Sequence, residues 1–166
     1  MGKCILCGQP AGIFKTQHLE CVAIRDRGWT EMLGTARHAA AGRENLDNLE
    51  ARLASIANGA FIPEGDIRKA LIEGWEAAVD HLLDDGNLDR QEENALVAFK
   101  DRFSLSQSEL DHRGAFSRVV KGAILRDLLE GKVPQRVEVS GPLPFNFQKN
   151  EQLIYLFPAQ KITRDQ

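Results

Sequence analysis

The residues best suited to chemistry lie at the N-terminus, where all three cysteines fall within the first 21 positions. Cys4 and Cys7 form a C-x2-C pair, and His18 and Cys21 follow as H-x2-C. This is the ligand set of a tetrahedral Cys3His zinc site. Because four protein ligands leave no position for a catalytic water, the pattern predicts a structural Zn2+ ion that folds a short piece of chain.

The residues around these four side chains suit such a site. Gly8 follows the first pair directly and supplies the permissive backbone that a metal knuckle needs. The ten residues between the pairs, GQPAGIFKTQ, contain two glycines and one proline, so we expect a short hairpin or loop there. A spacing of three places His18 and Cys21 on one face of the first turn of a helix.

Two other interpretations of the cysteines are open. The C-x2-C pair could be a thioredoxin-like redox motif, although no βαβ pattern surrounds it. The cysteines could also be small buried hydrophobic residues. A disulfide framework is disfavoured, because the count is odd and the N-terminus MGKCILCG is not a signal peptide.

After Cys21 the apolar residues recur with the period of a helix. Asp89 with Glu92 and Ser106 with Glu109 each form a capping box ahead of an apolar run. The sequence predicts a mainly α chain with a helical bundle of about five helices joined by short loops. We expect these helices at residues 19–41, 46–58, 63–84, 89–103 and 106–131.

The segment LLDDGNLDRQEENALVAFKDRFSLSQSEL resembles the helix–turn–helix repeat of tellurite-resistance TerB-like domains, and the resemblance extends over residues 65–131. It implies a cytoplasmic helical module of bacterial stress-response or phage-defence proteins. Some TerB-like domains carry acidic metal-binding residues, and the matching candidates for a second metal are Asp84, Asp85, Asp89 and Glu92. The residues themselves also fit helix caps, which favour the positive N-terminus of the following helix.

From Lys132 the pattern changes to that of a short β segment. Residues 136–139 alternate like a strand, and the run 153–157 is typical of a buried strand. The stretch LPFNFQKNEQLIYLF resembles the opening strand of a pleckstrin-homology-like sheet domain. Because a lone hairpin is marginal in water, we expect a truncated sheet domain, or a strand that docks on the bundle or on a second copy of the chain.

Charge is distributed unevenly over the three predicted segments. Residues 1–43, the zinc-binding head and the first helix, carry a net charge of +3. Residues 44–131, the helical bundle, carry 10 basic and 18 acidic groups, and the tail 132–166 has a net charge of +2. The basic head gives candidate contacts for nucleic acid. These are Lys3, Lys15, Arg25 and Arg27.

Composition excludes several classes of protein. The chain of 166 residues is 43% hydrophobic and 27% charged, which is typical of a globular protein and not of a disordered one. No apolar run approaches the roughly 20 residues that span a bilayer, so we expect a cytoplasmic protein without a transmembrane segment.

No catalytic motif accompanies the zinc pattern. The sequence contains no Gly-rich phosphate loop, no G-x-S-x-G and no H-E-x-x-H, and no cysteine is left over as a nucleophile. The sequence therefore favours a non-catalytic interaction or adaptor module with a protein partner. The alternative is a nucleic-acid-binding protein that uses its basic head.

Overall fold

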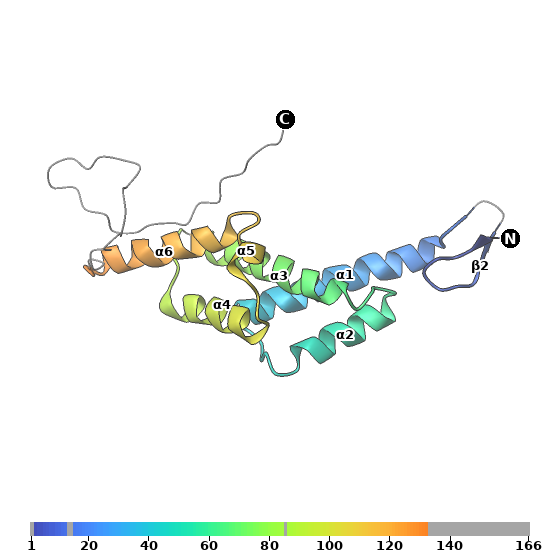
Figure 1. Cartoon of the computed structure of the whole chain (residues 1–166), viewed down its shortest axis with the longest axis horizontal. Coiled ribbons are helices and arrows are strands. Elements are labelled where there is room, and N and C mark those ends of the chain that lie inside the picture. Colours follow the sequence, from blue (N-terminus) through green and yellow to red (C-terminus); the bar gives the residue numbers. More distant parts are fainter. Residues whose placement is uncertain (1, 13–14, 85, 133–166) are drawn as a thin grey trace, which may run out of the picture. The chain divides into compact units, whose positions relative to one another are not determined.

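The computed structural model describes residues 2–12, 15–84 and 86–132. The chain divides into two compact units, residues 1–126 and 127–166, and only residues 127–132 of the second unit are among those described. The described part contains six helices and one two-stranded antiparallel sheet, which confirms the predicted mainly α fold (Figure 1). No helix within these ranges is long and apolar enough to cross a membrane.

The N-terminal head begins with a small hairpin. Strand β1 (Gly2–Lys3) pairs antiparallel with β2 (Pro10–Gly12), and an irregularity separates the two paired positions. The described residues before α1, 2–12 and 15–18, therefore contain very little regular structure. The chain then enters α1 (Leu19–Ala40), the longest of the described helices.

Helix α1 continues from the head into the body and packs closely on two other helices. It contacts α2 (Leu49–Gly59) and α3 (Asp66–Leu82). A Cβ added at Gly74 of α3 would lie 2.4 Å from the Cβ of Ala36 and 3.1 Å from its carbonyl carbon. The missing side chain at Gly74 therefore sets how closely α3 approaches α1.

The core of the body is centred on Trp75, which is 1% exposed. Its indole Nε1 donates a hydrogen bond to the carbonyl of Leu96 at 3.0 Å, and its ring stacks on Phe116 with centroids 6.4 Å apart. Leu96 belongs to α4 (Arg90–Arg102) and Phe116 to α6 (Ala115–Leu129). One buried tryptophan thus joins three helices and satisfies its only polar atom.

Both predicted capping boxes are present. Asp89 accepts hydrogen bonds from the backbone of α4, and the side chain of Glu92 reaches back to the Asp89 backbone N–H. Ser106 and Glu109 do the same for α5 (Gln107–Leu110). Each box satisfies N–H groups that a helix start would otherwise leave without partners.

The last predicted helix is wrong in one respect, because residues 106–131 form two helices rather than one. Helix α5 ends at Leu110, and α6 begins at Ala115. Gly114 adopts a positive φ of 74°, which no α-helix accommodates. The Asp111 carboxylate accepts hydrogen bonds of 2.9 Å from the backbone N–H and the hydroxyl of Ser117, so it caps the start of α6.

The predicted β segment of the tail, residues 133–166, lies outside the described residues. The strand at 153–157, its pleckstrin-homology-like resemblance and the association of two copies through it stay predictions. The division of the chain at residues 43 and 131 also stays a prediction.

The contact at Gly74 gives a stability test with a matched control. Replacing Gly74 by Ala forces α3 away from α1, and we expect a loss of about 1–3 kcal/mol of unfolding free energy. Gly34 lies in α1 with nothing within 4 Å of an added Cβ. Gly34→Ala should stabilise the chain by up to about 1 kcal/mol. Urea unfolding followed by circular dichroism measures both, and equal effects of the two changes would contradict the packing described.

Candidate metal centre

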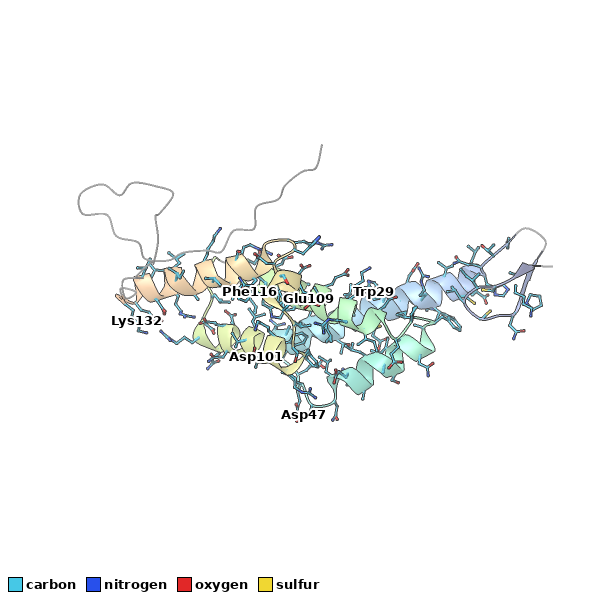
Figure 2. The ribbon with its side chains drawn as sticks, in the orientation of Figure 1. Trp29, Asp47, Asp101, Glu109, Phe116 and Lys132 are labelled. Carbon is cyan, nitrogen blue, oxygen red and sulfur yellow. The ribbon has the colours of Figure 1, made fainter. Side chains whose placement is uncertain are left out.

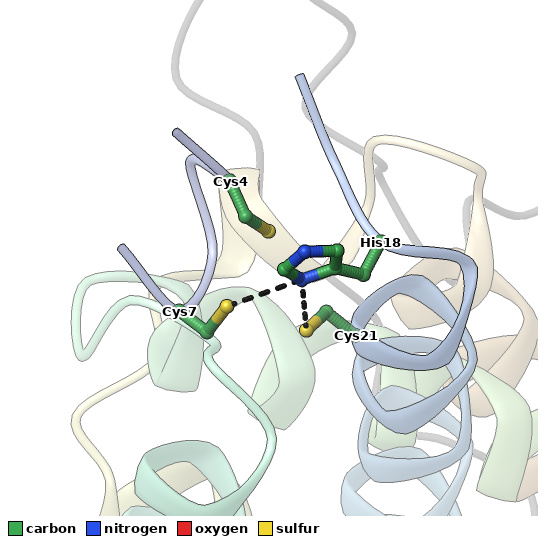
Figure 3. Close-up of side chains that lie close together, drawn as sticks. All are labelled: Cys4, Cys7, His18 and Cys21. Atoms are coloured by element: carbon green, nitrogen blue, oxygen red, sulfur yellow. Dashed lines mark hydrogen bonds between the residues drawn. The ribbon is translucent and has the colours of Figure 1, made fainter. Parts of the chain in front are cut away.

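The four predicted ligands come together at the N-terminal end of α1. The ligand atoms of Cys4, Cys7, His18 and Cys21 all lie within 4.8 Å of one another. Figure 3 shows the imidazole of His18 among the three sulfurs, with its Nδ1 3.3 Å from Cys7 Sγ and 3.6 Å from Cys21 Sγ. A tetrahedral zinc ion requires about 3.5–3.8 Å between neighbouring ligand atoms. The cluster is therefore compatible with a metal ion such as zinc.

The first two ligands lie on a tight backbone turn. The Cys4 N–H donates to the carbonyl of Gln9 at 2.7 Å, and the Gly8 N–H donates to the carbonyl of Cys4 at 2.8 Å. Gly8 has a φ of 74°, so the glycine expected after the C-x2-C pair performs the predicted role. The Ile5 N–H reaches the carbonyl of Thr16 at 3.0 Å, which ties this turn to the chain just before His18.

His18 is oriented by a hydrogen bond on the side of its ring away from the sulfurs. It is the N-cap residue of α1, and its Nε2 lies 2.9 Å from the carbonyl oxygen of Pro10. Because a carbonyl can only accept, Nε2 carries the proton and Nδ1 presents its lone pair to the cluster. A backbone carbonyl behind the outer nitrogen is the usual support of a metal-binding histidine. Cys21 follows on the first turn of α1, as its spacing predicted.

The sulfurs differ in their electrostatic environment. Burial raises the pKa of Cys4, but backbone N–H groups of Cys7, His18 and Leu6 outweigh it and bring that pKa down to about 6. Burial and the neighbouring sulfurs of Cys7 and Cys4 raise the pKa of Cys21 to about 11. The cluster thus favours the thiolate form of Cys4 and disfavours that of Cys21. A divalent cation would stabilise all of them as thiolates.

The cluster has a small hydrophobic core of its own. Cys4 is 1% exposed and packs with Cys21 and Ala11, and Leu6 and Phe61 lie against this group. Phe61 belongs to the loop after α2 and has a positive φ of 56°. The head therefore contacts the body through a residue that sequence spacing did not indicate. The apolar pair Phe61-Ile62 before Pro63 was the only available signal.

The four basic candidates for nucleic-acid contact are exposed, and the two arginines among them lie on different sides of α1. Lys3 and Lys15 belong to the head, and Arg25 and Arg27 lie on α1 with Asp26 between them. Two positions apart on a helix correspond to about 200° of rotation, so the two arginines point in nearly opposite directions. Arg27 also donates to the carbonyl of Ala23 within its own helix at 3.3 Å.

The described acidic candidates for a second metal, Asp84, Asp89 and Glu92, do not converge on one point. Asp89 and Glu92 bond to the backbone in the capping box of α4, Asp84 is exposed, and Asp85 lies outside the described residues. Across the ranges that the structure describes, the cysteine–histidine cluster is the one group of three or more potential ligands that converge. The capping interpretation of Asp89 and Glu92 is therefore confirmed.

Comparison with known proteins adds no family to this description. No protein-family model matches the chain, and neither a curated protein nor a solved structure matches it significantly. The metal centre consequently rests on its own geometry and donor chemistry.

Cobalt is a convenient probe of the centre, because tetrahedral Co2+ with thiolate ligands absorbs visible light. We expect the reduced, metal-free chain to develop these bands at one equivalent of Co2+. His18→Ala should lose tight binding, because it removes the only nitrogen ligand. His38 lies in the last turn of α1, and its side chain is 45% exposed. The His38→Ala variant should therefore bind Co2+ like the wild type. Equal binding by both variants would remove His18 from the ligand set.

Proposed function

We propose that the chain is a non-catalytic protein-interaction module, in which a structural zinc ion holds the N-terminal head against an acidic helical body. The observation that carries the proposal is the convergence of three sulfurs and one oriented imidazole within 4.8 Å. Thiolate and imidazole are the ligands that zinc prefers, and four of them complete its tetrahedron. A zinc ion so enclosed has no open position for substrate or water, which supports a structural role.

The shape of the head also supports a structural ion. Strands of two and three residues cannot hold a hairpin together in water. A metal bound by Cys4 and Cys7 on one side and by His18 and Cys21 on the other would close this segment onto α1. Metal binding would then supply the folding free energy that the small apolar core of the head lacks.

The body offers surface for a protein partner. Residues 44–131 carry 18 acidic groups against 10 basic ones, which favours a partner with positive charge. The bacterial stress-response or phage-defence setting is part of the proposal, and its support is the TerB-like resemblance of residues 65–131. A cytoplasmic location has the same support.

Removal of one ligand tests the structural role of the metal. Cys7→Ser should abolish stoichiometric zinc binding and unfold the head, while the helical circular-dichroism signal stays mostly intact because α2 to α6 do not contribute ligands. Zinc content by native mass spectrometry and proteolysis of residues 1–18 provide the readouts. A Cys7→Ser chain that still holds one zinc ion and a protected head would overturn the assignment.

Binding of nucleic acid by the basic head is the alternative function. It requires Lys3, Lys15, Arg25 and Arg27 to meet a phosphate backbone, so affinity for an oligonucleotide should fall steeply between about 50 and 200 mM salt. Fluorescence anisotropy with single- and double-stranded oligonucleotides measures this directly. The opposite directions of Arg25 and Arg27 favour the protein-interaction proposal.

Affinity capture from the native host distinguishes the two functions. We expect the tagged chain to retain a protein partner in the presence of nuclease, and the wild type and the Cys7→Ser variant should be run side by side. Material that disappears on nuclease treatment would contradict the proposal and support the basic head as a nucleic-acid reader.

A further inference from the structure

A groove of about 660 Å³ lies on the body between α3 and the segment that contains α5. Its walls come from α3, from α5 and from the turn that follows α5. Glu109, labelled in Figure 2, belongs to α5 and lines the groove. Ile72 of α3 contributes an apolar side chain to the lining. None of its lining residues belongs to the cysteine–histidine cluster, so the groove is a separate feature of the molecule.

Glu76 is the unusual residue of the groove. Its side chain is only 9% exposed, and it is the one buried acidic residue among those the structure describes. Its nearest charged partner, Arg113, lies 3.8 Å away, which is too far for a hydrogen bond. Among the described residues no fully buried side-chain oxygen lacks a hydrogen-bond partner, so the Glu76 carboxylate must reach the space of the groove.

Two further charged pairs line the groove. Arg68 forms two hydrogen bonds of 2.8 and 2.9 Å with the Glu109 carboxylate and a third with the carbonyl of Ser104. Lys69 lies 3.8 Å from Glu73 and 5.3 Å from the centre of the Trp29 ring. Glu73 and Glu76 each have an ion pair at 3.8 Å and no hydrogen bond to the described protein, and of the two only Glu76 is buried. A buried carboxylate in that condition is costly and would gain most from a cationic donor.

We propose that this groove binds the guanidinium group of an arginine side chain presented by a partner protein, with Glu76 as its acceptor. A guanidinium donates two parallel hydrogen bonds to one carboxylate, and its three-carbon stem can lie against the apolar lining at Ile72. The net negative charge of residues 44–131 adds long-range attraction for such a partner. The inference rests on the proposed interaction function and names the chemistry of the partner.

Arg113 competes with the partner's guanidinium group for the Glu76 carboxylate. Its side chain is 71% exposed and is held near Glu76 by an ion pair at 3.8 Å, a contact that an exposed arginine can leave at little cost. An incoming guanidinium that hydrogen-bonds Glu76 would displace it. Removal of Arg113 should consequently strengthen binding, whereas removal of Glu76 should weaken it.

The test uses two capped tripeptides that differ in one atom group, acetyl-Ala-Arg-Ala-amide and its uncharged citrulline counterpart. Each is titrated into the full zinc-loaded chain and followed by 1H–15N NMR. We expect the arginine peptide to shift amide signals around Ile72, Glu76 and Arg113 and to bind at least about tenfold more tightly than the citrulline peptide.

Three variants make the test specific. Glu76→Gln should lose the preference for arginine, and Glu50→Gln, the same exchange at an exposed site on α2, should retain it. Arg113→Ala should bind the arginine peptide more tightly than the wild type. Glu76→Gln should also unfold at a temperature no lower than that of the wild type at pH 7, because it removes a buried charge.

Equal affinity for the two peptides, shifts away from the groove, or an unchanged preference in Glu76→Gln would each overturn the inference. These results would leave the interaction function intact if affinity capture still retained a protein partner. Loss of that partner with arginine binding preserved would instead count against the wider function.

Discussion

The close packing of α1 against its neighbours is the constraint on which the rest of the structure depends. His18 is the N-cap of α1 and Cys21 lies on its first turn, while the helix packs against α2 and α3. A Cβ at Gly28 would lie 2.1 Å from the Cβ of Ala60, just as one at Gly74 would meet Ala36. The packing thereby fixes the helix in the body, and with it two of the four candidate ligands. Only the C-x2-C turn has to be brought to them.

This arrangement explains why the cluster and the helical body belong together. Preformed ligands reduce the entropy that metal binding must overcome. Phe61, in the loop after α2, adds a second contact between head and body, because it packs on the small core around Cys4 and Cys21. If the proposed ion holds the head, its loss would release the head and leave the contact of Trp75 with Phe116 untouched, since that contact lies in the body. Under the proposed zinc binding, metal ligation would stabilise the head, whereas apolar burial stabilises the body.

Much of this architecture could be predicted from the sequence, because it depends on local patterns. The ligand spacing, Gly8 and both capping boxes are signals between near neighbours in the chain, and the structure contains each of them. The break at Gly114 was missed, because the apolar steps of four from Phe116 to Leu128 were extended back to Leu110. Leu110 lies six positions before Phe116, which is not a helical spacing, and residues 111–114 contain no apolar side chain. Phe61 and Glu76 could not be predicted for a different reason. Their roles arise from contacts between distant segments, and Glu76 among other charges looks like one more solvated residue.

X-ray absorption at the zinc edge of the purified chain tests the central claim most directly, since it reports the elements bound to the metal. The account predicts one zinc ion per chain with three sulfur ligands at about 2.3 Å and one nitrogen at about 2.0–2.1 Å. A zinc shell dominated by oxygen, or one with fewer than three sulfurs, would contradict a metal centre built from Cys4, Cys7, His18 and Cys21.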